Sequence, residues 1–209
     1  MELILNPMEI EKKSFEIITE RLNEKTLDKD KEDIIKRAIH TSADFDYADN
    51  LYFSEGAVEK GLEALDNNAT IITDTAMALS GISKPALKAL NCKAVCFMSD
   101  PDVAEEAKKR GITRAMVSME RACEIKGRVI FAIGNAPTAL LNINELYKEG
   151  RLSPALIIGV PVGFVNVVEA KEIIIESGIP CIVARGNKGG SNIAAAISNA
   201  LLYRRYRRE

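Results

Sequence analysis

The chain contains one histidine, His40, in the segment IHTSADFDYAD, and its surroundings suit a positioned proton donor. It follows the apolar helical run DIIKRAI, and the negative end of a helix favours the protonated imidazolium. Thr41, Ser42, Asp44 and Asp46 supply nearby hydrogen-bonding groups that could orient the imidazole. The motif G-x-S-x-G is absent, which disfavours a serine hydrolase. His40 is therefore a candidate general acid, although a lone histidine also occurs as a surface or packing residue.

Three glycine-containing stretches, IGNAPTA, IGVPVGFVN and ARGNKGGSN, each lie between an expected strand and an expected helix. Glycine permits a close approach to the backbone, and the first amides of a helix attract anions. Tight turns also use glycine for their own geometry, so one loop alone would indicate nothing. Three in succession predict a ligand with several carboxylates or phosphates, contacted by Arg185, Asn187, Lys188 and Ser191. The spacing matches neither G-x-G-x-x-G nor the P-loop, which disfavours an ordinary dinucleotide or P-loop site.

Arg114 begins the apolar run RAMVSME. An arginine there could bind a carboxylate in a bidentate manner. It could equally be a solvated residue at a strand edge, and the residues alone leave both interpretations open.

The elements that must position these residues alternate along the chain. After Asn68, short apolar runs resembling strands (ATIITDT, KAVCFMSD, RAMVSME, RVIFAIGN, PALIIGV and PCIVARG) alternate with helical runs. Strands that are apolar throughout indicate a sheet covered on both faces. We therefore predict an α/β fold with a doubly wound, mainly parallel sheet, helices on both faces and a helical N-terminal portion, all in a single domain, 1–209. Ligands of such sheets bind at the carboxyl ends of the strands.

Two boundaries are predicted within the N-terminal part. The helical pattern extends from Pro7 to about Arg37, and Asp49 or Asn50 is expected to cap a helix that runs through Val58.

Composition limits the class of protein. The 209 residues are 47% hydrophobic and 28% charged, which is enough for a sizeable core. The formal net charge is -2, so we expect no nucleic-acid partner, and an anionic ligand must be held locally. No apolar run approaches the ~20 residues of a membrane span, and the start lacks a signal layout, which predicts a cytoplasmic protein without a membrane partner. The four cysteines are expected to be small core residues rather than zinc ligands.

Longer stretches of the chain form a specific set that extends in order over nearly its whole length. They are KRAIHTSADFDYADNL (36–51), TIITDTAMALSGISK (70–84), FMSDPDVAEEAKKRGITRA (97–115), AIGNAPTALLNINEL (132–146), PALIIGVPVGFVNVVEAKE (154–172) and ARGNKGGSNIAAAISNALLY (184–203). Together these stretches resemble the precorrin-8X methylmutase family, which includes the cobalt-precorrin-8 enzymes.

The resemblance implies an isomerase of corrin-ring (cobalamin) biosynthesis that moves a methyl group from C11 to C12 of precorrin-8 or its cobalt-bearing form. The product would be hydrogenobyrinate or cobyrinate, without a cofactor and without a metal held by the protein. The family's histidine falls on His40, which would act as general acid. The resemblance also implies a homodimer with substrate sites where the subunits meet. It places Ser14, Thr73, Asp74, Thr75 and Arg114 around the tetrapyrrole substrate.

Spacing alone suggests that Asp44 or Asp46 orients His40, and whether the natural substrate carries cobalt stays open, with a slight preference for cobalt. Two alternatives belong to other classes. One is a carrier that binds an anionic tetrapyrrole without turnover, in which His40 would be dispensable. The other is a nucleotide-dependent α/β enzyme, which NAD or ATP would stabilise thermally.

Overall fold

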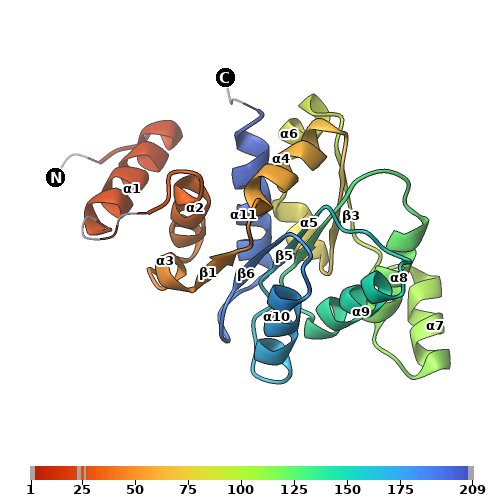
Figure 1. Ribbon diagram of the computed structural model, residues 1–209. Coiled ribbons are helices and arrows are strands. Elements are labelled where there is room, and N and C mark those ends of the chain that lie inside the picture. The colour runs from red at the N-terminus through yellow and green to blue at the C-terminus, as the bar shows by residue number, and fades with distance from the viewer. Residues whose placement is uncertain (1–2, 23–24, 26, 207–209) are drawn as a thin grey trace.

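The computed structural model describes residues 3–22, 25 and 27–206, and its six strands form one sheet in the order β1-β6-β5-β4-β2-β3 (Figure 1). The strands are β1 (Leu51–Phe53), β2 (Thr70–Thr73), β3 (Lys93–Val95), β4 (Val129–Ile133), β5 (Leu156–Gly159) and β6 (Cys181–Ala184). Neighbouring strands are parallel, except that β1 pairs with β6 in the antiparallel direction. This confirms the predicted mainly parallel α/β fold.

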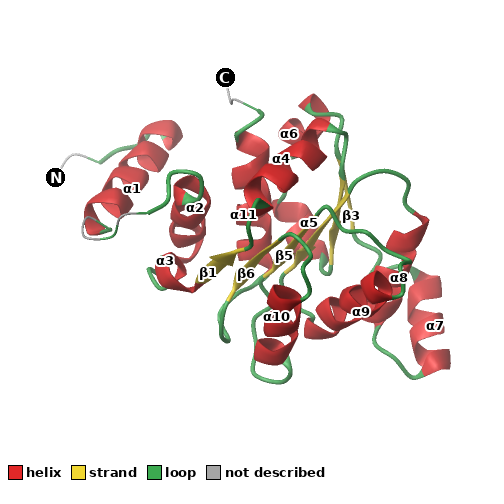
Figure 2. Ribbon diagram, viewed as in Figure 1, coloured by secondary structure: helices red, strands yellow, loops and turns green. Residues whose placement is uncertain are grey.

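Helices connect the strands and cover the sheet (Figure 2). The α-helices are α1 (Pro7–Arg21), α2 (Glu32–Ser42), α3 (Tyr47–Asn50), α4 (Ala57–Asp66), α5 (Ala76–Gly81), α6 (Lys84–Ala89), α7 (Pro101–Arg110), α8 (Arg114–Arg121), α9 (Pro137–Lys148), α10 (Val167–Glu176) and α11 (Ser191–Tyr203). A short 3-10 helix, Ala122–Glu124, follows α8.

The core has two parts, one on each face of the sheet, because successive side chains of a strand point to opposite faces. Along β4, Ile130 and Ala132 pack with α4, α5, α6 and α11. Phe131 and Ile133 face the other way and pack with α8, α9 and α10. The predicted helices on both faces are thus confirmed. The runs that form β2, β4, β5 and β6 are largely apolar because these strands are covered on both faces, whereas the edge strands β1 and β3 are only partly buried.

The N-terminal helices form a layer beside the sheet. Helix α2 packs against α11 through the buried side chains of Ile34, Ile35 and Ile39, and α1 packs on α2. The helical N-terminal portion is confirmed as two helices rather than one continuous pattern.

Two local predictions were wrong. The run RAMVSME is helix α8, because the Thr113 hydroxyl accepts a hydrogen bond from the Met116 amide and caps a helix. The residues Asp49 and Asn50 end helix α3 and lead into β1, and α4 begins only at Ala57 after Gly56 turns at φ 67°. Within the described ranges, no helix combines the length and the hydrophobicity that a bilayer crossing requires.

Candidate active site

The antiparallel pairing of β1 places His40 at the edge of the sheet where the glycine loops lie. Leu51, the first residue of β1, pairs with Ala184, the last residue of β6. The Arg185 amide also donates a hydrogen bond to the Asn50 carbonyl at 2.8 Å. Since β2, β4, β5 and β6 run parallel, their carboxyl ends meet at this same edge. The segment from His40 to Asn50 therefore borders the loops that follow the strands.

His40 occupies the last turn of α2 and is exposed in the single chain. Its ring stacks on that of Phe15 from α1, with centroids 5.1 Å apart and an interplanar angle of 28°. The imidazole makes no hydrogen bond or ion pair with any residue that the structure describes. Helix α2 ends beside it, at Ala43 (φ 57°). The ring is therefore held by stacking, and its nitrogens are available to a ligand.

Asp44 and Asp46, predicted to orient His40, have a different partner in the structure. The Lys188 ammonium donates to one carboxylate oxygen of each, at 2.6 Å in both cases. The Lys188 ammonium lowers the pKa of Asp44 below its ordinary value, and the two carboxylates raise the pKa of Lys188. The hydroxyl of Ser42 accepts from the Asp44 amide at 3.2 Å and so shapes the turn. These carboxylates tie the His40 segment to the loop after β6 rather than hold the imidazole.

Asp74 lies at the carboxyl end of β2 and is fully buried. Its carboxylate accepts hydrogen bonds from the amides of Gly134, Asn135 and Ala136, at 2.9, 2.7 and 2.6 Å. Burial raises the pKa of Asp74, and the three amide donors oppose this effect. The amides of the IGNAPTA loop, predicted to bind an anionic ligand, therefore already bind the protein's own carboxylate. Asp74 organises the start of α9 and has no surface left for a substrate.

Thr73, Thr75 and Ser191 continue this edge. Thr73 is fully buried, and its hydroxyl donates to the Thr75 carbonyl at 3.0 Å. The Thr75 hydroxyl caps α5 and lies 2.8 Å from the hydroxyl of Ser191, the first residue of α11. Thr75 and Ser191 are half-buried, so this pair keeps some surface at the site.

The loop after β6 carries the other predicted residues. Arg185 is exposed and places its guanidinium 5.0 Å from the centre of the Tyr52 ring. The Asn187 side-chain amide donates to the Gly163 carbonyl at 2.7 Å, and the Gly163 amide donates to the Asn187 carbonyl at 3.1 Å. The loops after β5 and β6 are thus joined to each other.

Close backbone contact fixes the same loops. A methyl group on Gly134 would lie 2.6 Å from Cα of Ser191, and one on Gly189 would collide with the Val160 carbonyl. These glycines are needed for loop-to-loop packing, a reason for glycine that the sequence pattern does not distinguish from anion binding.

Lys171 is a site residue that the sequence reasoning missed. It belongs to α10 and is fully buried, and its ammonium donates to the carbonyls of Gly186 and Lys188 at 2.6 and 2.9 Å. Burial lowers the pKa of Lys171 to about 8. A signal was present, because Lys171 lies four residues after Val167 and three before Ile174, on the buried face of the helix.

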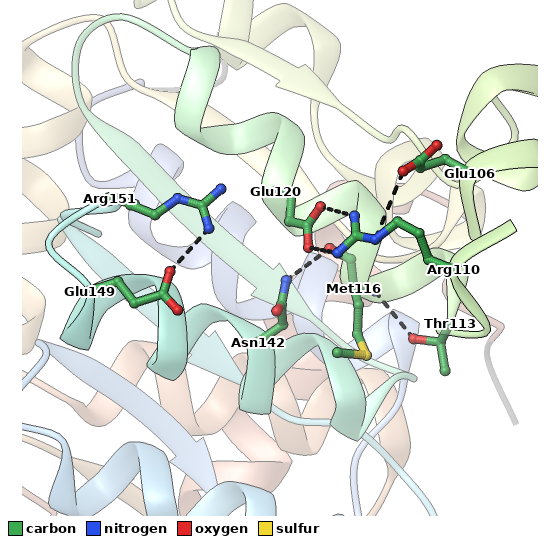
Figure 3. Close-up of polar contacts among 8 residues, drawn as sticks. All are labelled: Glu106, Arg110, Thr113, Met116, Glu120, Asn142, Glu149 and Arg151. Atoms are coloured by element: carbon green, nitrogen blue, oxygen red, sulfur yellow. Dashed lines mark hydrogen bonds and ion pairs between the residues drawn. The ribbon is translucent and has the colours of Figure 1, made fainter.

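Arg114 lies at the start of α8, apart from the loops after β5 and β6. The Thr113 hydroxyl is 3.0 Å from that of Thr138, so this end of α8 adjoins the start of α9 at the carboxyl edge. Figure 3 shows how the helix is held: Arg110 of α7 binds Glu120 through two hydrogen bonds, and the Asn142 side chain donates to the Met116 carbonyl. Arg114 itself is exposed.

Ser14 lies on α1 next to Phe15, and its hydroxyl donates to the Ile10 carbonyl at 2.8 Å. A cavity of about 880 Å³ lies between α1 and α2. It is lined by Met8, Glu11, Lys12, Phe15, Glu16, Thr19, Glu20, Lys36 and Arg37. Three glutamates and three basic residues balance each other in this lining, so the cavity offers no net positive charge to a ligand with many carboxylates, and we place the candidate site at the loop edge.

The described part of the chain brings no three histidine, cysteine, aspartate or glutamate side chains together as a metal site. The arrangement offers instead one available imidazole and a rim with basic side chains. Such an edge suits an anionic ligand and acid catalysis.

Known proteins resemble this chain over most of its length. Residues 9–204 match the family described as "CbiC: Precorrin-8X methylmutase". Cobalt-precorrin-8 methylmutase of Salmonella typhimurium is 44% identical over 97% of this chain and 98% of its own length, and that of Leptospira interrogans is 43% identical over 92% and 91%. A crystal structure of precorrin-8X methylmutase from Thermus thermophilus has a TM-score of 0.85 and 36% identity, covering 92% of this chain and 95% of the other. The chain therefore belongs to the precorrin-8X methylmutase family and is an isomerase of cobalamin biosynthesis.

Proposed function

We propose that the chain moves a methyl group from C11 to C12 of cobalt-precorrin-8, giving cobyrinate with its cobalt, and that His40 is the general acid. The observation that carries this assignment is the antiparallel β1–β6 pair, which sets the His40 segment against the basic loop after β6. The preference for the cobalt-bearing substrate rests on the names of the relatives from Salmonella and Leptospira.

The properties of His40 suit the acid role. His40 lies in the last turn of α2, and stacking on Phe15 fixes the plane of the ring. Its nitrogens bind no described residue, so both are free for the macrocycle. A proton, or a hydrogen bond, delivered to a ring nitrogen would polarise the conjugated system. The migrating carbon then leaves C11 and bonds to C12 within one molecule, which leaves mass and oxidation state unchanged.

The rim suits the rest of the substrate, a flat apolar ring fringed by carboxylates. Arg185, Arg114, Asn187 and the Thr75–Ser191 pair present polar groups along the edge of the sheet. Phe164, in the loop after β5, is 89% exposed and offers an aromatic surface beside them. Thr73 and Asp74 would hold the loops in position without contacting the substrate, and Ser14 would contribute to the site from helix α1.

We also propose a homodimer in which a second copy covers the exposed apolar surface around α1. Its residues are Leu3, Ile4, Leu5, Met8, Ile10 and Ile17. Several exposed large apolar side chains within one short segment are typical of protein interfaces. Light scattering should give the mass of two chains, and the mass of one chain would contradict the dimer.

The test of the acid role compares His40→Ala with His40→Gln. Both variants should fold and bind the macrocycle, and His40→Ala should lose at least about 100-fold in turnover, since positioned acid catalysis contributes about 10²–10⁴-fold. Glutamine donates a hydrogen bond but transfers no proton, so turnover of His40→Gln as low as that of His40→Ala would indicate proton transfer, and partial recovery would indicate that a hydrogen bond contributes. The absorbance change on mixing with precorrin-8 and with cobalt-precorrin-8 measures turnover and substrate preference together. Near wild-type turnover of either variant would refute the general acid.

A further inference from the structure

Lys171 is a buried cation whose partners are backbone carbonyls. Its side chain is 0% exposed, and its ammonium binds the carbonyls of Gly186 and Lys188. No ion pair joins it to any carboxylate among the residues that the structure describes. Burying a charge without an opposite charge is costly, and the lowered pKa of about 8 reflects that cost. The formation of a hydrophobic core therefore does not explain why a lysine occupies this buried position.

The two carbonyl contacts fix the orientation of two peptide groups. Every described peptide bond is trans, so the amide that follows each carbonyl points in the opposite direction. With the carbonyls of Gly186 and Lys188 turned toward Lys171, the amides of Asn187 and Gly189 point away from it. Neither amide donates a hydrogen bond to a described residue.

These amides belong to the loop after β6. Asn187 is exposed and Gly189 is half-buried, and Lys188 between them reaches Asp44 beside the His40 segment. The loop is further joined to Gly163 through Asn187. Lys171 thus acts from inside the fold on the peptide groups that line the rim.

We propose that Lys171 is a positioning residue for substrate binding, and that it holds the amides of Asn187 and Gly189 where they bind a carboxylate of the macrocycle. This inference rests on the proposed function and adds the anion contact and the residue that creates it. The reacting proton comes from His40 on a separate segment, so Lys171 governs affinity more than the chemical step.

The experiment compares Lys171→Met, Lys171→Gln and the control Lys60→Met. Methionine fills the space without a donor, glutamine retains N–H donors, and Lys60 is exposed on α4 near Pro154 and Pro180, at the opposite edge of the sheet. Three quantities are measured. Amide hydrogen exchange of the ligand-free protein is followed over residues 185–190, the Kd for cobyrinate is obtained by absorbance titration, and kcat is measured at saturation.

We expect Lys171→Met to exchange at least tenfold faster in the 185–190 segment and to bind cobyrinate about tenfold more weakly, with a smaller fall in kcat than in affinity, because Lys188 of the same loop also contacts the segment after His40. Lys171→Gln should recover part of both losses, and it replaces the methionine variant if that protein does not fold. Unchanged exchange or an unchanged Kd in both variants would overturn the proposal, as would an equal effect of Lys60→Met. If the wild-type protein binds no corrinoid, the proposed function is wrong, and so is the proposed carboxylate ligand of these amides. The hydrogen-exchange data would still decide whether Lys171 anchors the loop.

Discussion

The Lys188 ammonium lies 2.6 Å from a carboxylate oxygen of Asp44 and thereby joins the loop after β6 to the segment that follows His40. Asp46 binds the same ammonium. Lys188 was predicted to contact the substrate directly, but its charge is already matched by these two carboxylates. Its position indicates that it links the loop after β6 to the segment of His40, the proposed proton donor.

The first prediction concerns this link. Lys188→Met should lower kcat/KM by about tenfold, because small displacements of a catalytic group are costly. Asp44→Asn should lower it by less, because Asp46 still binds the Lys188 ammonium. The double variant should be no worse than Lys188→Met alone, since Lys188→Met already removes the contacts with both carboxylates. Stability should change little, because exposed ion pairs contribute about 0–1 kcal/mol. A double-mutant cycle on kcat/KM makes the measurement, and additive losses would show that the two residues act independently.

The second prediction concerns Asp74, which holds three amides at the start of α9. In Asp74→Asn one acceptor becomes a donor that faces an amide, so the free energy of unfolding should fall by about 2–3 kcal/mol. For a chain of this size that corresponds to a Tm lower by about 5–10 °C. Asp66→Asn, which alters an exposed ion pair with Arg205, is the matched control and should lose less than about 1 kcal/mol. Equal losses of unfolding free energy in the two variants would mean that the buried amide contacts of Asp74 contribute no more than an exposed ion pair.

The third prediction is a pH dependence caused by Lys171. Its pKa in the folded protein is about 8, against an ordinary value of about 10.4 in an unfolded chain. Between these values the unfolded chain binds more protons than the folded one, so the free energy of unfolding rises with pH. Relative to Lys171→Met, the wild type should gain up to about 3 kcal/mol between pH 7.5 and 10.5. Urea unfolding of both proteins across that range measures the difference, and parallel curves would show that Lys171 does not titrate there.

Much of the fold was predictable because local pattern and burial agree in five of the six described strands. Each of these strands is apolar on both faces, which marks it in the sequence. Strand β1 was missed, since its three residues are specified by pairing with β6 and not by their own pattern. The short run at Arg114 was assigned to a strand although the Thr113 cap was visible in the sequence.

The site residues were predicted to meet at the carboxyl ends of the strands, and the structure brings the His40 segment to that edge. Which polar group satisfies which partner depends on distances across the fold. For that reason the occupied amides at Asp74 and the Lys188 link emerged only from the structure, whereas the buried position of Lys171 was indicated by its spacing on the helix.

Gly134 and Gly189 allow the loops of the rim to touch one another through their main chains. The framework of the rim is thus set by main-chain contacts, while the exposed side chains are supplied separately. Replacing those exposed side chains should therefore leave the main-chain framework in place.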